Sequence, residues 1–380
     1  MSFIPAGVLE RIHQRAARHD QENSFPFDDL QDLRECGYLT AFVPAEFGGA
    51  GLTLAEICQA QTDLAKAAPG TALGINMHHI IVGLGRHLHR HGESGGETIL
   101  RAAAAGDLFG FGISEPGNDL VLFGSITRAE PQTNGDYRLY GRKIFTSLAP
   151  AWTKLATFGC DSSDPEDVRN VFGLLQRDSG GINIVDDWDT MGMRATQSNS
   201  TELNGAVVKA EHVLAKVTPG PSAHPVVFGI FAYFEILLAA TYRGLGQRAL
   251  ELAAETVKSR HSVRRDAPYA TDPDIRWRIA SAAIAMDAVD APIELAAQDI
   301  ENGVDRGVKW MPQLSALKHR TCEAAKYAVE EAVRASGGSS YYNSKELSRL
   351  YRDVLAGLFQ PSDAESVHGA WASLLLGPLP

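Results

Sequence analysis

The chain has 380 residues, more than one hydrophobic core usually holds, so we expect two or three domains. Hydrophobic residues make up 44% of the sequence and charged residues 21%, which is the composition of a folded globular protein and excludes extended disorder. The formal net charge of -11 argues against nucleic acid as a partner, because an acidic surface repels the phosphate backbone.

The cysteines and the apolar segments indicate a cytoplasmic protein. The four cysteines lie far apart in the sequence and form no CxxC pair, which predicts reduced thiols without a disulfide framework or a metal site. Residues 1–14 lack the continuous apolar core of a signal peptide. The most apolar stretch, residues 226–241, carries Glu235 and is shorter than the roughly 20 residues of a membrane span, so it predicts a buried helix.

Residues 1–107 predict an N-terminal α-helical domain. Apolar positions from Phe27 onward recur with a period near 3.6, and Gly37 is a natural stop for that helix. Thr53 is a candidate N-cap for a second helix, which runs to Ala67 and is broken at Pro69.

Residues 108–224 predict a central antiparallel β-barrel or β-sandwich. Asn134 and Gly135 stand between two apolar runs, which is a strong hairpin signal. Short apolar runs alternate with turns, as β-strands do, at 108–113, 124–129, 137–140, 154–159 and 171–175.

Residues 225–380 predict a C-terminal four-helix bundle, because long proline-free helical segments in a globular protein usually pack in this way. The stretch Gly244 to Ala249 matches a GxGxxA pattern, but it lies inside a helical segment with no strand before it. We therefore interpret its small residues as a close helix–helix contact and not as a dinucleotide site. The helical segments are 228–259, 274–303, 314–336 and 345–375, the last interrupted at Pro361.

Clustered histidines raise the question of a metal site. The i, i+4 spacing of His87 and His91 would suit a helix, but no HExxH motif is present. Interleaved arginines favour a solvated basic face instead. No GxSxG elbow supports a serine hydrolase either. The histidines concerned are His78, His79, His87, His89 and His91.

Several motifs together resemble the acyl-CoA dehydrogenase family. Val43 to Leu52 resembles its VPxExGGxG turn, and five further matches follow in the family's order over nearly the whole chain. Each motif is weak alone, whereas the ordered set is specific. The matches are Ser114-Glu115-Pro116, Gly141 to Ser147, Met193-Arg194 with Asn199 to Thr201, Gly337-Gly338, and Arg352-Asp353.

The resemblance implies an FAD cofactor whose isoalloxazine ring lies against the β domain of a homo-oligomer, either a dimer or a tetramer. Hydroxyls and backbone amides at the matched positions suit the ring's polar atoms, and an aromatic side chain suits its face. The matched flavin-facing residues are Phe111, Ile113, Ser114, Phe145, Thr146 and Ser147. Residues aligned with those that meet FAD from a neighbouring subunit are Arg260, Ser262, Arg334 and Gly338.

The resemblance also implies a carboxylate base, and here the chain departs from the family. The usual glutamate position is occupied by Pro361, which cannot accept a proton. The remaining candidates are Asp363 and Glu235. Glu235 follows Phe234, the position of the base in a second subset of the family. Burial would raise the pKa of Glu235, but a buried ion pair with an arginine on a facing helix is an equal alternative.

Two enzymatic hypotheses follow, and a third is non-catalytic. The first is an FAD-dependent dehydrogenase of an acyl thioester of CoA or a carrier protein, with an electron-transfer flavoprotein as partner. The second is a two-component monooxygenase that uses O2 and reduced flavin from a separate reductase on a small aromatic or amine substrate. Pro361 suits this second hypothesis, with Ser147, Tyr233 or His368 steering the oxygen. The third is a flavin-binding protein without activity.

The substrate loop also departs from the family. The segment Glu115 to Asp119 is two residues shorter than the family's loop and lacks the serine that meets the pantetheine arm. The resemblance therefore supports flavin binding more strongly than it supports binding of an acyl-CoA.

Overall fold

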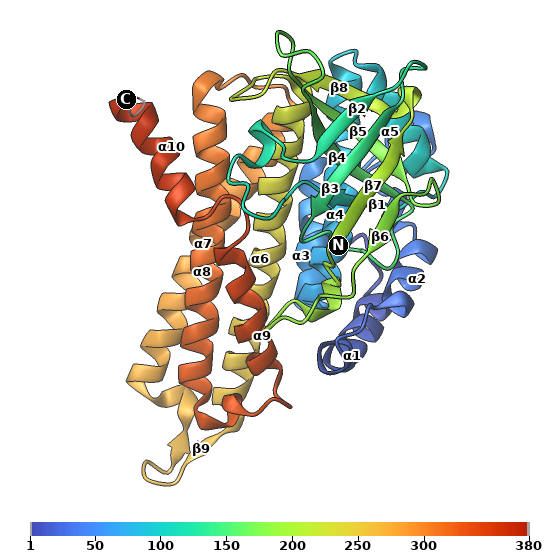
Figure 1. Cartoon of the computed structure of the whole chain (residues 1–380). Coiled ribbons are helices and arrows are strands. Elements are labelled where there is room, and N and C mark those ends of the chain that lie inside the picture. The colour runs from blue at the N-terminus through green and yellow to red at the C-terminus, as the bar shows by residue number, and fades with distance from the viewer. Residues whose placement is uncertain (1, 378–380) are drawn as a thin grey trace.

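The computed structural model describes residues 2–377 and arranges them as helices, then strands, then helices (Figure 1). This order confirms the predicted fold class. The N-terminal region contains α1 (Ala6–Glu22), α2 (Phe27–Glu35), α3 (Leu54–Ala67), α4 (Pro69–Arg90) and α5 (Ser94–Ala104).

The boundaries of the N-terminal helices follow from their capping residues. Thr53 and Glu56 form a capping box at the start of α3, where Glu56 N donates to Thr53 Oγ1 over 3.2 Å and Thr53 N to Glu56 Oε2 over 2.8 Å. Gly37, with φ 78°, follows the end of α2. Pro69 does break α3, as expected, and it also begins α4, because a proline is tolerated at the first helical position.

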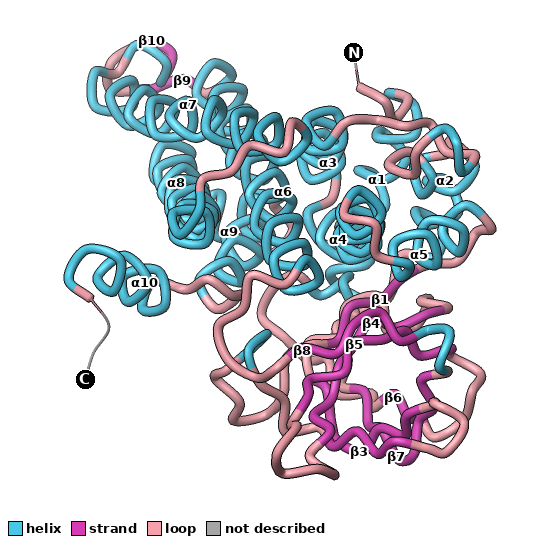
Figure 2. The backbone as a smooth tube through the Cα atoms, turned by 90° about the horizontal axis from the view of Figure 1, so that it is seen from above, coloured by secondary structure: helices cyan, strands magenta, loops and turns pink. Residues whose placement is uncertain are grey.

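The middle region is an eight-stranded sheet that curves around on itself, as Figure 2 shows. Most of its pairings are antiparallel, including the predicted hairpin between β2 and β3, although β4 pairs in parallel with both β1 and β2. The order is β6-β7-β3-β2-β4-β5-β8, with β1 beside β4. The strands are β1 (Phe109–Gly112), β2 (Arg128–Pro131), β3 (Tyr137–Lys143), β4 (Lys154–Asp161), β5 (Arg169–Gln176), β6 (Ile182–Ile184), β7 (Thr201–Val208) and β8 (Val213–Val217).

The C-terminal region forms the predicted helical bundle. Its first helix, α6, lies between the N-terminal helices and the rest of the bundle (Figures 1 and 2). A small hairpin of β9 (His261–Ser262) and β10 (Ala267–Pro268) projects from the end of the bundle that lies away from the large sheet (Figure 1). The helices are α6 (Pro225–Ser259), α7 (Pro273–Glu301), α8 (Trp310–Ser336), α9 (Glu346–Val354) and α10 (Ala364–Leu376).

Helix α6 is a core helix, as its sequence predicted. By length and composition it would be able to cross a membrane, but 78% of its most apolar window is buried inside the protein. A Cβ at Gly244 would lie 2.2 Å from the Thr62 carbonyl oxygen, and one at Gly246 would lie 2.7 Å from the Met286 sulfur. The small residues therefore allow the close helix contacts that we expected.

The prediction that the clustered histidines form a solvent-exposed basic face of α4 is wrong for most of them. His78 and His79 have no exposed surface, because α4 packs between α3, α5 and α6. His78 Nε2 lies 2.7 Å from the Leu39 carbonyl oxygen, its Nδ1 accepts from Phe109 N, and burial lowers its pKa to about 4. Only the last turn, with His89 and His91, is exposed.

The tight approach of α6 to α3 yields a stability prediction. Gly244→Ala places a methyl group against the Thr62 backbone and should lower the free energy of unfolding by about 1–3 kcal/mol, the usual range for overpacking. Gly369→Ala, in α10, is the matched control, because a Cβ added there would have no other atom within 4 Å. Thermal melts compare the two. Equal melting temperatures would contradict the close contact.

Candidate functional site

Strand β1, the loop after it and the loop after β3 carry the six matched positions. The loop after β1 carries Ser114, and the loop after β3 carries Thr146. Ile144 N donates to the Ser114 carbonyl oxygen over 2.9 Å, which joins the two loops. A Cβ at Gly112 would lie 3.4 Å from Thr146 Oγ1, so the strand and the second loop are in contact.

Phe145 presents an aromatic ring to the outside at this junction. Its side chain is 60% exposed although it is large and apolar, and its φ of 56° is a left-handed conformation that phenylalanine rarely adopts. The ring meets Trp188 edge-on with centroids 6.2 Å apart. Strained backbone of this kind is typical of functional sites, and the exposed ring offers a face to a planar ligand.

The hydroxyl groups beside Phe145 fit a flavin ring. Thr146 is fully buried and its Oγ1 has no hydrogen-bond partner within the protein. The Ser147 hydroxyl lies 2.7 Å from that of Ser198, which lies 2.7 Å from that of Thr196. Buried polar atoms are normally paired. An unpaired hydroxyl next to an exposed aromatic ring is therefore suited to the nitrogen and oxygen atoms of an isoalloxazine.

Helix α6 forms the wall opposite these loops. The Phe111 and Phe234 ring centroids lie 6.1 Å apart, so Phe234 brings α6 into contact with one of the matched positions. Successive helical residues point about 100° apart. The neighbouring residue, Glu235, is consequently turned toward α8 and the turn that contains Pro361.

The Glu235 side chain is fully buried and bonded to a serine. Ser362 Oγ donates to Glu235 Oε1 over 2.7 Å and lies 3.0 Å from Ser315 Oγ, whereas Glu235 Oε2 has no partner. Burial raises the pKa of Glu235 to about 7, although Ser362 and the Lys318 charge oppose the shift. The partner is thus a serine and not the arginine of the ion-pair alternative.

Asp363 caps a helix. Its Oδ1 accepts from Ser366 N over 2.9 Å at the start of α10. Partial burial alone would raise the pKa of Asp363, but its hydrogen bonds with Ser366 outweigh burial and the pKa is lowered. An engaged capping carboxylate with a lowered pKa is a poor proton acceptor.

The second group of predicted residues lies at the far end of the bundle, near β9 (Figure 1). Arg260 Nη1 donates to the Ser336 carbonyl oxygen, and its guanidinium lies 5.0 Å from the centroid of the Tyr269 ring. Gly337, which precedes Gly338, is close enough that a Cβ would lie 3.2 Å from Arg260 Nη1.

Within one chain, Arg260, Ser262 and Gly338 therefore gather apart from the flavin-facing loops. Ser262 lies in β9, where its hydroxyl accepts from Arg265 N over 3.3 Å. Arg334 is exposed and pairs with Glu330 over 2.6 Å. A contribution of these residues to a neighbouring subunit's cofactor stays a prediction.

Sequence reasoning missed the ion pair that holds the two flavin-facing loops. Lys143 Nζ lies 2.7 Å from Glu115 Oε1, and both side chains are completely buried. Thr127 N also donates to Glu115 over 2.9 Å. Although burial opposes ionisation, the Lys143 charge and these donors lower the Glu115 pKa to about 2. The only signal in the sequence was that Glu115 and Lys143 each stand inside a family motif.

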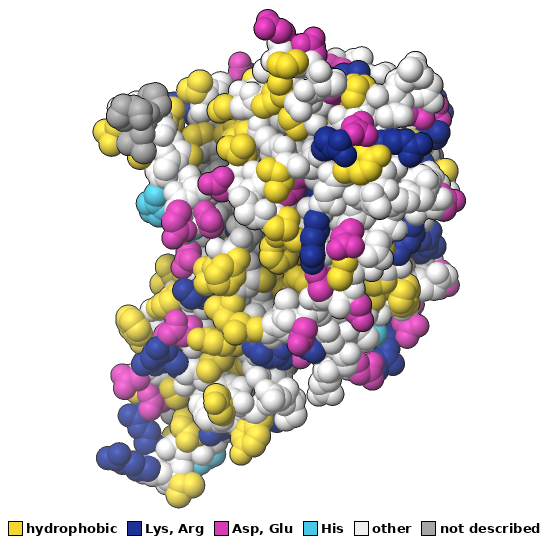
Figure 3. All heavy atoms as spheres, viewed as in Figure 1, with side chains coloured by type: hydrophobic (Ala, Val, Ile, Leu, Met, Phe, Trp, Pro, Cys, Tyr) yellow, Lys and Arg dark blue, Asp and Glu magenta, His cyan; other side chains and the backbone are white. Residues whose placement is uncertain are grey.

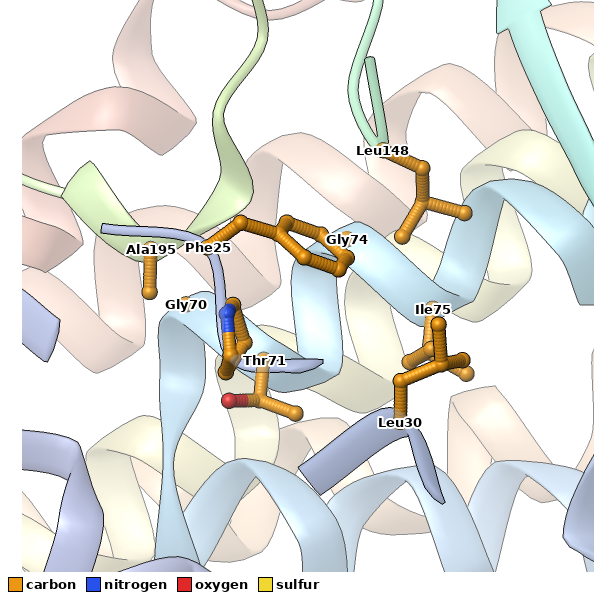
Figure 4. A pocket seen from close by; sticks show the side chains of 9 residues that line it. Phe25, Leu30, Gly70, Thr71, Gly74, Ile75, Leu148 and Ala195 are labelled. Atoms are coloured by element: carbon orange, nitrogen blue, oxygen red, sulfur yellow. The ribbon is translucent and has the colours of Figure 1, made fainter. Parts of the chain in front are cut away.

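A narrow apolar pocket, too tight to admit a water molecule, lies behind the second loop, where Leu148 follows Ser147. Figure 4 shows Phe25, Leu30 and Ile75 around this space. Its one hydroxyl, on Thr71, donates to Asp29 over 2.8 Å and offers little to a polar ligand. The pocket is lined by Phe25, Pro26, Leu30, Gly70, Thr71, Gly74, Ile75, Leu148 and Ala195.

Comparison with known proteins defines the class. The family model of the acyl-CoA dehydrogenase N-terminal domain matches residues 6–113, and that of the acyl-CoA dehydrogenase C-terminal domain matches residues 225–359. Together they cover well over half of the chain. The protein therefore belongs to the acyl-CoA dehydrogenase superfamily of flavoproteins, which confirms the resemblance and the flavin.

Individual relatives include more than one activity. L-evernosamine nitrososynthase of Micromonospora sp. is 29% identical over 93% of this chain and 84% of its own. Putative acyl-CoA dehydrogenase YdbM of Bacillus subtilis is 28% identical over 95% and 92%. The structure of KijD3 in complex with FMN and dTDP-3-amino-2,3,6-trideoxy-4-keto-3-methyl-D-glucose superposes with a TM-score of 0.87 and 26% identity, covering 99% of this chain and 92% of that one.

The buried ion pair predicts a large stability effect. Lys143→Met leaves the Glu115 carboxylate buried without its counter-charge and should cost about 3–5 kcal/mol of unfolding free energy. Lys209→Met removes the exposed partner of Asp136, a 3.1 Å pair, and should cost less than about 1 kcal/mol. Chemical denaturation measures both. A similar loss in the two variants would refute a structural role specific to Lys143.

Glu235 predicts a pH dependence of stability. Its pKa in the folded protein, about 7, is above its usual 4.5, so the fold favours the protonated form. Stability should therefore fall as pH rises from about 4.5 to about 7, by roughly 3 kcal/mol at 1.36 kcal/mol per pKa unit. Glu235→Gln should remove this slope, and Glu46→Gln, an exposed control, should keep it. Chemical denaturation at several pH values measures this dependence. If the unfolding free energy of Glu235→Gln still fell with pH as in the wild type, Glu235 would not be protonated in the folded protein.

Proposed function

We propose that this protein is a flavin-dependent monooxygenase that oxygenates the nitrogen of a small amine with O2 and reduced flavin. One observation carries the proposal. The position of the usual dehydrogenase base is Pro361, and the α6 position of the base in the second subset is Phe234, whose ring contacts Phe111. Neither of the two places where the resemblance puts a base has a carboxylate, whereas removal of the α-proton of a thioester requires one.

The net reaction needs no such base. An amine R–NH2, O2 and reduced flavin give R–NHOH, water and oxidised flavin. Reduced flavin, when bound, supplies the two electrons that O2 requires. In the proposal the Thr146 and Ser147 hydroxyls hold the ring's polar atoms, and Phe145 covers its face. Phe111 and Phe234 exclude water from the reacting side, which limits loss of oxygen as peroxide.

An amine substrate is supported by the relatives. A nitrososynthase is named for making a nitroso group, and KijD3 was solved with FMN and an amino sugar nucleotide. We propose FMN in preference to FAD, because the two arginines aligned with residues that meet FAD already have partners. Arg334 pairs with Glu330, and Arg260 donates to Ser336. A separate cytoplasmic flavin reductase would then supply the reduced cofactor.

A homo-oligomer is also part of the proposal. Figure 3 shows hydrophobic side chains gathered over the helical bundle. Exposed large side chains of this region include Tyr341, at 91%, and Phe359, at 83%. Contiguous exposed apolar groups of this kind mark protein interfaces, so we expect a dimer or a tetramer.

The second candidate is the acyl-thioester dehydrogenase, favoured by one observation. Glu235 lies beside the turn of the usual base and has a pKa near neutrality, the range of an effective general base. Bound oxidised flavin that is bleached anaerobically by an acyl-CoA, with the bleaching lost in Glu235→Gln, would establish this candidate.

The proposal is tested by supplying reduced FMN from a flavin reductase with NADH in air, with the dTDP-linked amino sugar of the KijD3 complex and simple primary amines as substrates. We expect a product 16 mass units heavier than the amine and no reduction of bound flavin by acyl-CoA thioesters. Reduction by a thioester without oxygen, and no oxygenated amine, would reverse the assignment.

The orphan hydroxyl of Thr146 gives a sharper prediction. Thr146→Val should leave the stability of the flavin-free protein unchanged or slightly higher, because the lost hydroxyl has no partner there. Flavin affinity should fall roughly five- to tenfold for one lost hydrogen bond. Thr321→Val, a buried control whose Oγ1 donates to Leu317 O, should not change flavin affinity. Titration followed by flavin fluorescence measures the affinity. An unchanged affinity in Thr146→Val would mean that the Thr146 hydroxyl does not contact the flavin.

A further inference from the structure

The turn 357–362, which holds Pro361, is anchored from inside the bundle by a buried lysine. Lys318, on α8, has no exposed surface, and its Nζ donates to the carbonyl oxygens of Gly357 and Gln360 over 2.7 Å and of Ser362 over 3.2 Å. Because Lys318 donates hydrogen bonds to three carbonyl oxygens of one turn, it fixes the backbone path of that turn. It also leaves no short ion pair between Lys318 and Glu235.

A second anchor joins the same turn to α6. Ser362 is buried and donates to Glu235 Oε1, and its oxygen also lies 3.0 Å from the Ser315 hydroxyl on α8. Three elements therefore meet at one serine. Because Glu235 Oε2 has no partner, the charged form of this carboxyl would be poorly solvated, and a neutral side chain with the same shape suffices for the contact.

The anchored turn is linked to the flavin-facing surface through adjacent residues of α6. Phe234 precedes Glu235 and contacts Phe111. The hydrogen bond from Ser362 to Glu235 thus ties the turn to the part of α6 that presents Phe234 to Phe111. In the proposed site, Phe234 and Pro361 would bound the substrate, and both lie next to residues that this hydrogen bond joins.

We infer that Glu235 is a positioning residue, which together with Ser362 and Lys318 holds the turn 357–362 and Phe234 so that the substrate's reacting nitrogen is aligned. This inference rests on the proposed monooxygenase function. Glu235 transfers no proton in this account. Its contribution is a neutral hydrogen bond, and glutamine should therefore replace it.

The first experiment needs no substrate. Hydrogen exchange of the amides in 357–363 is measured for the full chain and for Glu235→Ala, Ser362→Ala, Glu235→Gln and Thr321→Val. The two variants that lose the hydrogen bond should exchange about tenfold faster, because opening is eased by about one buried hydrogen bond. Glu235→Gln and the Thr321→Val control should stay near the wild-type rate. Unchanged protection in both alanine variants would overturn the inference.

The second experiment measures how much of the consumed O2 becomes product, with reduced FMN and the dTDP-linked amino sugar of the KijD3 complex as the probe. Glu235→Ala and Ser362→Ala should release several-fold more hydrogen peroxide per product, while flavin binding is unchanged. Glu235→Gln should restore coupling. If Glu235→Gln loses product as completely as Glu235→Ala, Glu235 transfers a proton and the inference is wrong.

The two measurements distinguish failure of the positioning role of Glu235 from failure of the proposed monooxygenase function. Oxygenation that fails in the wild-type protein refutes the proposed monooxygenase. Exchange rates that distinguish alanine from glutamine at position 235 still report on the turn itself, whatever the reaction.

Discussion

The burial of α6 is the constraint on which the rest of the structure depends. This helix contacts the N-terminal helices on one side and α7 and α8 on the other, so it belongs to the cores of two regions at once. Close approach is possible because Gly244 and Gly246 have no side chains to separate the helices. The same helix carries Phe234 to the flavin-facing loops and Glu235 to the turn 357–362. A single packing arrangement therefore determines the wall of the site and the orientation of its nearest carboxyl group.

Three acidic side chains near this region show how environment assigns different roles to similar groups. Glu115 is buried with a lysine and several donors and stays ionised, so it joins two loops electrostatically. Asp363 caps a helix and has a lowered pKa. Glu235 is buried with only a serine hydroxyl and has a raised pKa. The surroundings of each side chain therefore decide its charge. Glu115 stays ionised beside a lysine, whereas Glu235 favours the protonated form because it is buried without an ion-pair partner.

Local signals in the sequence were sufficient for most of the fold. The N-cap at Thr53 and the hairpin at Gly135 each depend on a few neighbouring residues, so the pattern alone predicts them. The parallel pairing of β4 with β1 and β2 depends on contacts between distant residues and was not predictable in this way. The histidines of α4 were misassigned because their burial is decided by helices that pack against them, not by their own spacing.

The site was predictable only where it follows motifs. The two loops that carry most of the matched positions are joined at Ser114 and Ile144, and that these positions face a flavin stays a prediction. The hydrogen bond between Glu235 and Ser362 was not predictable, because these residues are 127 positions apart and only the fold brings them into contact. The difference between a proton acceptor and a positioning residue likewise depends on which way one helical side chain points.

The source of the oxygen atom in the product tests the central claim most directly. Turnover with reduced FMN and an amine under ¹⁸O2 in ordinary water, followed by mass spectrometry, distinguishes oxygen transfer from other flavin chemistry. The account predicts one ¹⁸O atom in each product molecule and none when the label is supplied as water. An amine that remains unlabelled while all the O2 consumed is recovered as hydrogen peroxide would contradict it.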